Sequence, residues 1–188
     1  MRNCIIYLIG FIGVGKLTTA REICHQDQSF RLFDNHAANN VIFSLVRDGQ
    51  KPLPKGVWGS IHQVRAAMYD AIVNVAPRDY NYVLTNALVQ DDAGDHRVYK
   101  SVQDMAGKRG SHFLPVRLLC NEFENKSRIA SPAREAQQKK TTSDGVSAWH
   151  RGRVLIPDHP HTMSIDISNS APADTAAKIL ARAALICG

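Results

Sequence analysis

The chain has 188 residues, 44% of them hydrophobic, and it carries a formal net charge of +6. This length favours a single domain over residues 1–188, and no apolar run reaches the roughly 20 residues that span a bilayer, so we expect no membrane partner. Four widely spaced cysteines without a C-x-x-C pair favour a reduced, cytoplasmic protein with buried thiols over a disulfide framework or a zinc site.

The first half of the chain alternates between strands and helices. An apolar strand is predicted at 4–9, and a helix whose apolar residues share one face follows at 16–26. The pattern then predicts a strand at 30–33, a helix at 37–47, a loop at 50–56 and an amphipathic helix at 58–75 that Pro77 ends.

The second half continues this alternation. Strands are predicted at 80–85, 113–120 and 162–167, and helices near 95–108 and at 173–186. Strands separated by helices predict an α/β fold, with a parallel sheet covered by helices on both faces. Ligands of such sheets bind at the carboxyl ends of the strands, which lie here at Gly10, Asp34, Asn86, Asn121 and Ser168.

One stretch, residues 121–158, is polar and has little apolar periodicity. Its central part, 126–153, holds seven basic residues against two acidic ones, and Trp149 is its only aromatic residue. Because no pattern of aromatic residues for stacking on bases accompanies this charge, we do not expect nucleic acid as the partner. We interpret 121–158 as a basic lid over a nucleotide, with a solvated charged face as the alternative.

A phosphate-binding loop follows the first predicted strand. Residues 10–18 read Gly-Phe-Ile-Gly-Val-Gly-Lys-Leu-Thr, which is the pattern G-x-x-x-x-G-K between a strand and a helix. The glycines let backbone N–H groups turn toward an anion, and the lysine and the helix dipole add positive charge. The predicted nucleotide-binding residues are therefore Gly10, Gly13, Val14, Gly15, Lys16, Leu17 and Thr18.

The residue after the loop lysine departs from the usual pattern. A Ser or Thr that ligates Mg²⁺ is typical there, but this chain has Leu17 and then Thr18. We expect Thr18 to be the metal-side hydroxyl, with the ion held partly through water or by an acid elsewhere in the chain.

Polar residues at the end of the second strand form a candidate acceptor site. Asp34 is followed by His36 and Asn39, and a carboxylate at this position can orient a substrate hydroxyl, accept its proton or hold a Mg²⁺-bound water. The alternative is that Asp34 or Asn35 only caps the next helix. For His36, an ordinary hydrogen-bonding role is an equal alternative.

Arg65 lies beside the apolar face of the helix at 58–75. An arginine in this position either packs its stem and solvates its head, or binds an acidic group of an acceptor. Trp58 and His62 on the same helix are further pocket candidates.

The third strand ends at Thr85 and Asn86. Motor-type ATPases have an acidic residue at this point, but the nearest acids here are Asp91 and Asp92, which argues against a mechanical ATPase. Asn86 is a candidate substrate-binding residue instead.

Arg128 and Arg134 follow the fourth strand. Phosphoryl transfer is mostly positioning and charge stabilisation, and we expect these arginines to supply charge from a mobile segment that closes over the site.

These motifs together resemble the small P-loop kinases of the nucleoside monophosphate kinase and shikimate kinase group, over nearly the whole chain. The chain looks most similar to a branch known as AAA-family ATPases or shikimate-kinase-like proteins. The residues that carry this likeness are 9–18, Asp34-Asn35-His36, Asn39-Asn40, Pro52-Leu53-Pro54, Trp58, Thr85-Asn86, 128–134 and Asp158-His159-Pro160.

The resemblance implies a five-stranded parallel sheet in the order 2-3-1-4-5, a lid after the fourth strand, and Mg-ATP as the phosphate donor. It implies that Lys16 contacts the transferred phosphate, Thr18 the other phosphates, Arg128 and Arg134 the nucleotide from the lid, and Asp34 the acceptor. The Asp-Gly-Phe-Pro-Arg stretch of nucleoside monophosphate kinases and the glycine triplet of shikimate kinases are absent, so neither named substrate is expected.

The sequence therefore predicts an ATP-dependent phosphotransferase that acts on a small-molecule hydroxyl or phosphate. The alternatives are an ATP-binding hydrolase and a nucleotide-sensing regulatory protein. The motifs leave the acceptor and the oligomeric state open.

Overall fold

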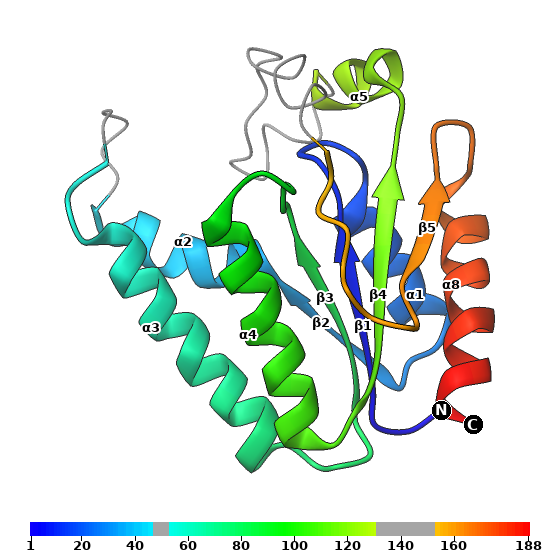
Figure 1. The fold of residues 1–188 in the computed structure, drawn as a ribbon, viewed down its shortest axis with the longest axis horizontal. Coiled ribbons are helices and arrows are strands. Elements are labelled where there is room, and N and C mark those ends of the chain that lie inside the picture. The colour runs from blue at the N-terminus through cyan, green and yellow to red at the C-terminus, as the bar shows by residue number, and fades with distance from the viewer. Residues whose placement is uncertain (47–52, 131–152) are drawn as a thin grey trace.

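A computed structural model describes residues 1–46, 53–130 and 153–188. Its centre is a five-stranded parallel sheet in the order β2-β3-β1-β4-β5, as the resemblance implied. The strands are β1 (Cys4–Ile9), β2 (Phe30–Asp34), β3 (Asn81–Asn86), β4 (His112–Leu119) and β5 (Met163–Asp166). All five point the same way, so their carboxyl ends share one edge of the sheet (Figure 1).

Helices cover both faces of this sheet (Figure 1). Those of the described residues are α1 (Lys16–Gln26), α2 (Asn35–Val46), α3 (Val57–Asp70), the π-helix η1 (Ala71–Val75), α4 (Ala93–Arg109), α5 (Glu122–Ile129) and α8 (Pro172–Cys187). The predicted strands and helices are present, with ends that differ from the prediction by a few residues.

The central strand β1 packs against a different core on each side. Its alternate residues point to opposite faces, so Cys4, Ile6 and Leu8 join a cluster with α1 and α8. Ile5, Tyr7 and Ile9 join a second cluster with α4 and η1. Because every residue of β1 is buried, the loop that follows it starts from a rigid base.

The structure departs from the sequence prediction in two helices. The predicted helix at 58–75 is α3 continued by the π-helix η1, where the guanidinium of Arg109 donates to the carbonyls of Ile72 and Ala76. Helix α5 was not predicted, because most of its residues are polar or charged and only Asn125 and Ile129 are buried.

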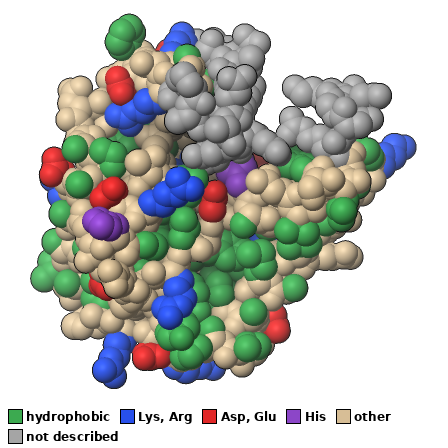
Figure 2. Space-filling view, turned by 180° about the vertical axis from the view of Figure 1, so that it is seen from behind, with side chains coloured by type: hydrophobic (Ala, Val, Ile, Leu, Met, Phe, Trp, Pro, Cys, Tyr) green, Lys and Arg blue, Asp and Glu red, His purple; other side chains and the backbone are tan. Residues whose placement is uncertain are grey.

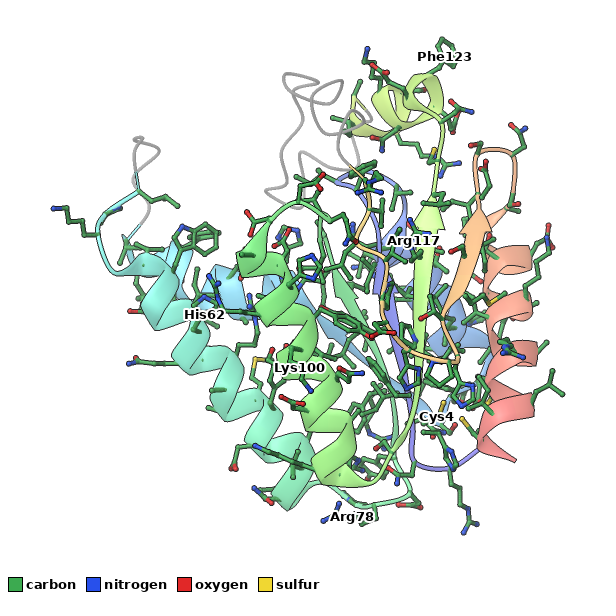
Figure 3. All side chains as sticks on the ribbon, viewed as in Figure 1. Cys4, His62, Arg78, Lys100, Arg117 and Phe123 are labelled. Atoms are coloured by element: carbon green, nitrogen blue, oxygen red, sulfur yellow. The ribbon has the colours of Figure 1, made fainter. Side chains whose placement is uncertain are left out.

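The two ends of the predicted lid are packed into the body of the protein. Residues 122–129 form α5, and the backbone of Val154 and Leu155 accepts hydrogen bonds from Arg117 of β4 (Figure 3). Leu155 also donates to the carbonyl of Leu88. The lid prediction therefore concerns the part between these ends, where 131–152, including Arg134, Ser131 and Pro132, lie outside the described residues, as does Pro52.

Candidate functional site

A cavity of about 1170 Å³ opens at the carboxyl edge of the sheet. Its walls come from the loop before α1, the ends of β2 and β3, one side each of α2, α3 and α4, and Arg128 of α5. Sequence-predicted residues in its lining are Gly13, Gly15, Lys16, Leu17, Thr18, Asp34, His36, Asn39, Trp58, His62, Arg65, Asn86 and Arg128. The topology thus brings residues from distant parts of the chain into one site.

The loop at 10–15 contains positions that only glycine occupies easily. Gly13 and Gly15 have φ values of 85° and 111°, in the left-handed region. A Cβ on Gly10 would lie 2.7 Å from the carbonyl oxygen of Leu118. Helix α1 starts immediately after Gly15, so its unpaired N–H groups and its dipole point toward the cavity.

Lys16 lies across this loop. Its Nζ donates to the carbonyl oxygens of Gly10 at 2.9 Å and Phe11 at 2.7 Å. The ammonium group therefore lies beside the loop glycines and lines the cavity.

Two side chains of helix α5 donate hydrogen bonds to the backbone of the same loop. Asn125, which is buried, donates from Nδ2 to the carbonyl of Ile12 at 3.0 Å, and Arg128 donates from Nη1 to that of Val14 at 2.9 Å. Arg128 also pairs with Glu124 at 2.7 Å and donates to the carbonyl of Ile167 at 3.0 Å. We expected Arg128 on a mobile segment, but it is fixed by these contacts to the loop and to the chain after β5.

Asp34 is positioned by the neighbouring strand. Its Oδ1 accepts a hydrogen bond from Thr85 Oγ1 at 2.7 Å, because β2 and β3 pair with Asp34 beside Thr85. The same oxygen lies 3.4 Å from the backbone nitrogen of His36, so it also caps the start of α2, though weakly. The two sequence interpretations of Asp34 are thus compatible, since it both caps a helix and lines the cavity.

Arg65 lines the cavity with a buried head group. The residue is 7% exposed, which argues against a head group that extends into bulk solvent. Nη2 donates to Asn39 Oδ1 at a long 3.4 Å, and Nε has no hydrogen-bond partner among the described residues. No carboxylate of the described chain lies within ion-pair distance. A buried cation without an acid is costly, which marks Arg65 as a place for an anion.

Sequence reasoning missed the wall that α4 contributes. Asp92, Asp95, Arg97 and Ser101 line the cavity. Asp92 caps α4 by accepting from the Asp95 nitrogen, and Asp95 accepts from the Val89 nitrogen at 2.8 Å. Burial raises the pKa of the Asp95 carboxyl. The sequence did offer one signal for Asp92 and Asp95. They lie at the start of the helix that follows a parallel strand, and such helix starts face the edge of the sheet where ligands bind.

Tyr69 of α3 was also missed. It lines the cavity, and burial raises the pKa of its hydroxyl to about 12, although Arg65 opposes the shift. The hydroxyl therefore stays protonated at neutral pH and can donate a hydrogen bond.

The predicted substrate-binding residue Asn86 lies at the end of β3. It is 9% exposed, and its Oδ1 accepts a hydrogen bond from the Ala87 nitrogen at 2.9 Å.

The charge of the cavity lining suits a phosphorylated ligand. Five basic side chains line it, against three carboxylates: Lys16, Arg21, Arg65, Arg97 and Arg128, with Asp34, Asp92 and Asp95. On the face shown in Figure 2, by contrast, Lys and Arg lie interspersed with acidic and apolar side chains rather than in one basic patch among the described residues. Among the described residues, basic side chains therefore gather in the cavity at the carboxyl ends of the strands.

The residues near the loop also fit a weakly ligated Mg²⁺. The described residues contain no cluster of three or more His, Cys, Asp or Glu side chains able to hold a metal. Thr18 is exposed to the cavity, one residue after Leu17. Because Mg²⁺ at phosphate sites keeps several waters and needs only one or two protein ligands, this arrangement is compatible with an ion that arrives with the nucleotide.

Comparison with known proteins gives likeness in fold but not in sequence. No family model and no curated protein matches the chain. Among solved structures, a Chloroflexus aurantiacus protein provisionally named a kinase has a TM-score of 0.70, 13% identity and 99% coverage of both chains. A gluconokinase from Sinorhizobium meliloti has a TM-score of 0.64 and 14% identity, over 98% of this chain and 94% of that one.

A third similar structure contains a nucleotide. It is the APS kinase of Mycobacterium tuberculosis in complex with AMPPNP and APS, with a TM-score of 0.56, 11% identity, and coverage of 96% and 97% of the two chains. In the parts of the chain that the structure describes, no helix is both long and apolar enough to cross a bilayer. The chain thus has the fold of the P-loop small-molecule kinases.

Proposed function

We propose that this protein transfers the γ-phosphate of Mg-ATP to a small-molecule acceptor. The observation that carries the proposal is the glycine loop with two residues of positive φ, continued by Lys16 at the start of α1, in the same cavity as Asp34. The fold likeness to kinases, one of them determined with AMPPNP, supports it.

The loop residues and Lys16 bind the phosphates in this proposal. The Lys16 ammonium leaves the carbonyls of Gly10 and Phe11 and contacts the β- and γ-phosphates instead. Thr18 contacts the phosphates and, with water, would hold a Mg²⁺ ion, which would supply charge neutralisation at the transferred group. Arg128 fixes the carbonyl of Val14 and with it the orientation of the loop peptide that binds the nucleotide. Arg134 remains a proposed lid residue.

The acceptor binds on the other side of the loop, between β2, α3 and α4. Asp34, held by Thr85, orients the acceptor hydroxyl and accepts its proton during attack. Arg65 binds an anionic group of the acceptor, a carboxylate or phosphate, because its buried guanidinium has no acid of the described chain beside it. His36, Asn39 and Asn86 complete the polar wall of this side. The proposed acceptor is thus a small hydroxylated anion.

The decisive experiment measures ADP release from Mg-ATP with a panel of acceptors. The panel pairs sugar acids, sugar phosphates, cyclic hydroxy acids, nucleosides and nucleotides with neutral analogues that lack the anionic group. We expect ADP release that depends on an anionic acceptor and that Lys16→Ala abolishes while the variant keeps its fold by circular dichroism. Retained turnover in Lys16→Ala contradicts the mechanism. Rapid hydrolysis without an acceptor favours a hydrolase, and nucleotide binding without any turnover favours a sensor.

A further inference from the structure

Two cysteines from opposite ends of the sequence meet in one core cluster. Cys4 is the first residue of β1 and is fully buried, and Cys187 is the last residue of α8. Cys187 is partly buried and packs against the cluster that contains Cys4. Figure 3 shows the Cys4 side chain beside the last turn of α8, where Figure 1 also has both ends of the chain.

The two thiols interact with each other and shift each other's pKa. The interaction raises the pKa of Cys4 above its ordinary value and lowers that of Cys187. The thiolate is the reactive form of cysteine, so Cys187 is the more nucleophilic of the pair. Its partial exposure lets a small reagent reach it, whereas Cys4 is sealed inside the core.

The other two cysteines lack such a neighbour. Cys24 of α1 and Cys120 after β4 are partly buried against the same cluster. Burial raises the pKa of both thiols, and no second thiol acts on either within the described residues. They therefore serve as internal controls for reactions of Cys4 and Cys187.

We propose that Cys4 and Cys187 form a reversible disulfide when the protein meets a low-molecular-weight disulfide as oxidant. The Cys187 thiolate attacks one sulfur of the reagent RS–SR, which breaks the S–S bond and releases RS⁻. The Cys4 thiol then loses its proton and attacks Cys187 Sγ, expelling the second RS⁻. Two protein thiols are oxidised to one cystine, and the reagent disulfide is reduced to two RSH.

This bond joins elements that carry the phosphate loop. β1 leads into the loop, while α8 packs against α1, which begins at Lys16. A cross-link between residues 4 and 187 restricts nearly the whole unfolded chain, and such large loops give the largest stabilisation in the chain-entropy account. We expect the oxidised protein to melt about 10 °C higher than the reduced protein.

The test treats the full chain with oxidised glutathione and follows intact mass, peptide maps and the melting temperature. We expect the loss of two hydrogen atoms, a peptide pair linking Cys4 to Cys187, and reversal by dithiothreitol. Cys24→Ser and Cys120→Ser should behave as the parent protein does. Cys4→Ser should stop at a glutathione adduct on Cys187, and Cys187→Ser should leave Cys4 unmodified.

Other outcomes overturn the proposal. A stable glutathione adduct on Cys187 in the parent protein, a disulfide that involves Cys24 or Cys120, or no reaction at all each contradicts it. The assay uses no turnover, so its result is independent of the proposed phosphotransferase activity.

Discussion

The guanidinium of Arg128 donates to the carbonyl oxygen of Val14 at 2.9 Å, so a helix that follows β4 holds the phosphate loop by its backbone. With Asn125 on the carbonyl of Ile12, α5 contacts two alternate carbonyls of the loop. Because the carbonyl and the N–H of one trans peptide point in opposite directions, holding the carbonyl of Val14 also fixes the direction of the Gly15 N–H. Arg128 is therefore a positioning residue for nucleotide binding.

This relationship predicts the effect of Arg128→Ala on nucleotide affinity. Loss of hydrogen bonds from a charged donor costs about 1.5–3 kcal/mol, so we expect AMPPNP to bind about 10- to 100-fold more weakly even without an acceptor. Calorimetric titration with AMPPNP and Mg²⁺ measures this. The matched control is Lys126→Ala, an exposed residue of the same helix paired with Glu122. Unchanged affinity with a reduced kcat would instead assign Arg128 a role in transfer alone.

Asp34 and Thr85 give a second prediction, on the transfer step. Asp34→Asn should retain AMPPNP affinity but reduce kcat by about 100-fold or more, because the amide cannot accept the acceptor's proton. Thr85→Val should reduce kcat less, since the carboxylate remains but loses the hydroxyl that orients it at 2.7 Å. Steady-state kinetics with the acceptor found in the panel checks both variants. Equal kcat in Asp34→Asn and the parent would show that Asp34 only caps α2.

The loop and the individual strands were predictable from sequence because their signals are local, whereas the order of the strands was implied by the family resemblance. Glycines at positions of positive φ, a lysine at the start of a helix and apolar strands are readable within short windows. Asp34 was found in the same way, because strand ends in a parallel sheet face the ligand.

The rest of the site depends on contacts distant in sequence. Arg65 is one residue among several on an amphipathic helix, and its burial next to Asn39 depends on how α2 packs on α3. The attachment of Arg128 to Val14 joins residues 114 positions apart, and a charged helix gives no apolar pattern that would reveal it. Contacts of this kind, between residues distant in sequence, can be identified only from the folded structure.

Arg109 gives a third prediction, on stability. Its guanidinium donates to the carbonyls of Ile72, Ala76 and Pro77 at the end of η1. Arg109→Met leaves the buried carbonyl of Ile72 and the part-buried carbonyls of Ala76 and Pro77 without these bonds, so we expect a loss of about 3 kcal/mol in the free energy of unfolding. Urea denaturation followed by circular dichroism measures it, with the exposed neighbour Lys108→Met as control. Equal midpoints for the two variants would contradict the role given to Arg109.

Arg65→Met gives the last prediction, in which the affinity for the acceptor falls while the stability of the protein does not. Without its guanidinium the cavity loses the cation for the acceptor's anionic group, so the KM for that acceptor should rise about 100-fold while AMPPNP affinity stays unchanged. The same change removes a buried charge that lacks a carboxylate partner in the described chain, and replacing such a charge with an apolar side chain is often neutral or stabilising. The ligand-free variant should therefore melt at the parent's temperature or above it.

The matched control for Arg65→Met is Gln63→Met, an exposed residue of the same helix that does not line the cavity. It should change neither KM nor the melting temperature. A neutral analogue of the acceptor should bind the parent and Arg65→Met equally, because its binding never involved the guanidinium. If Arg65→Met instead melts well below the parent with an unchanged KM, Arg65 is a structural residue that supports Asn39, and the anionic acceptor is wrong.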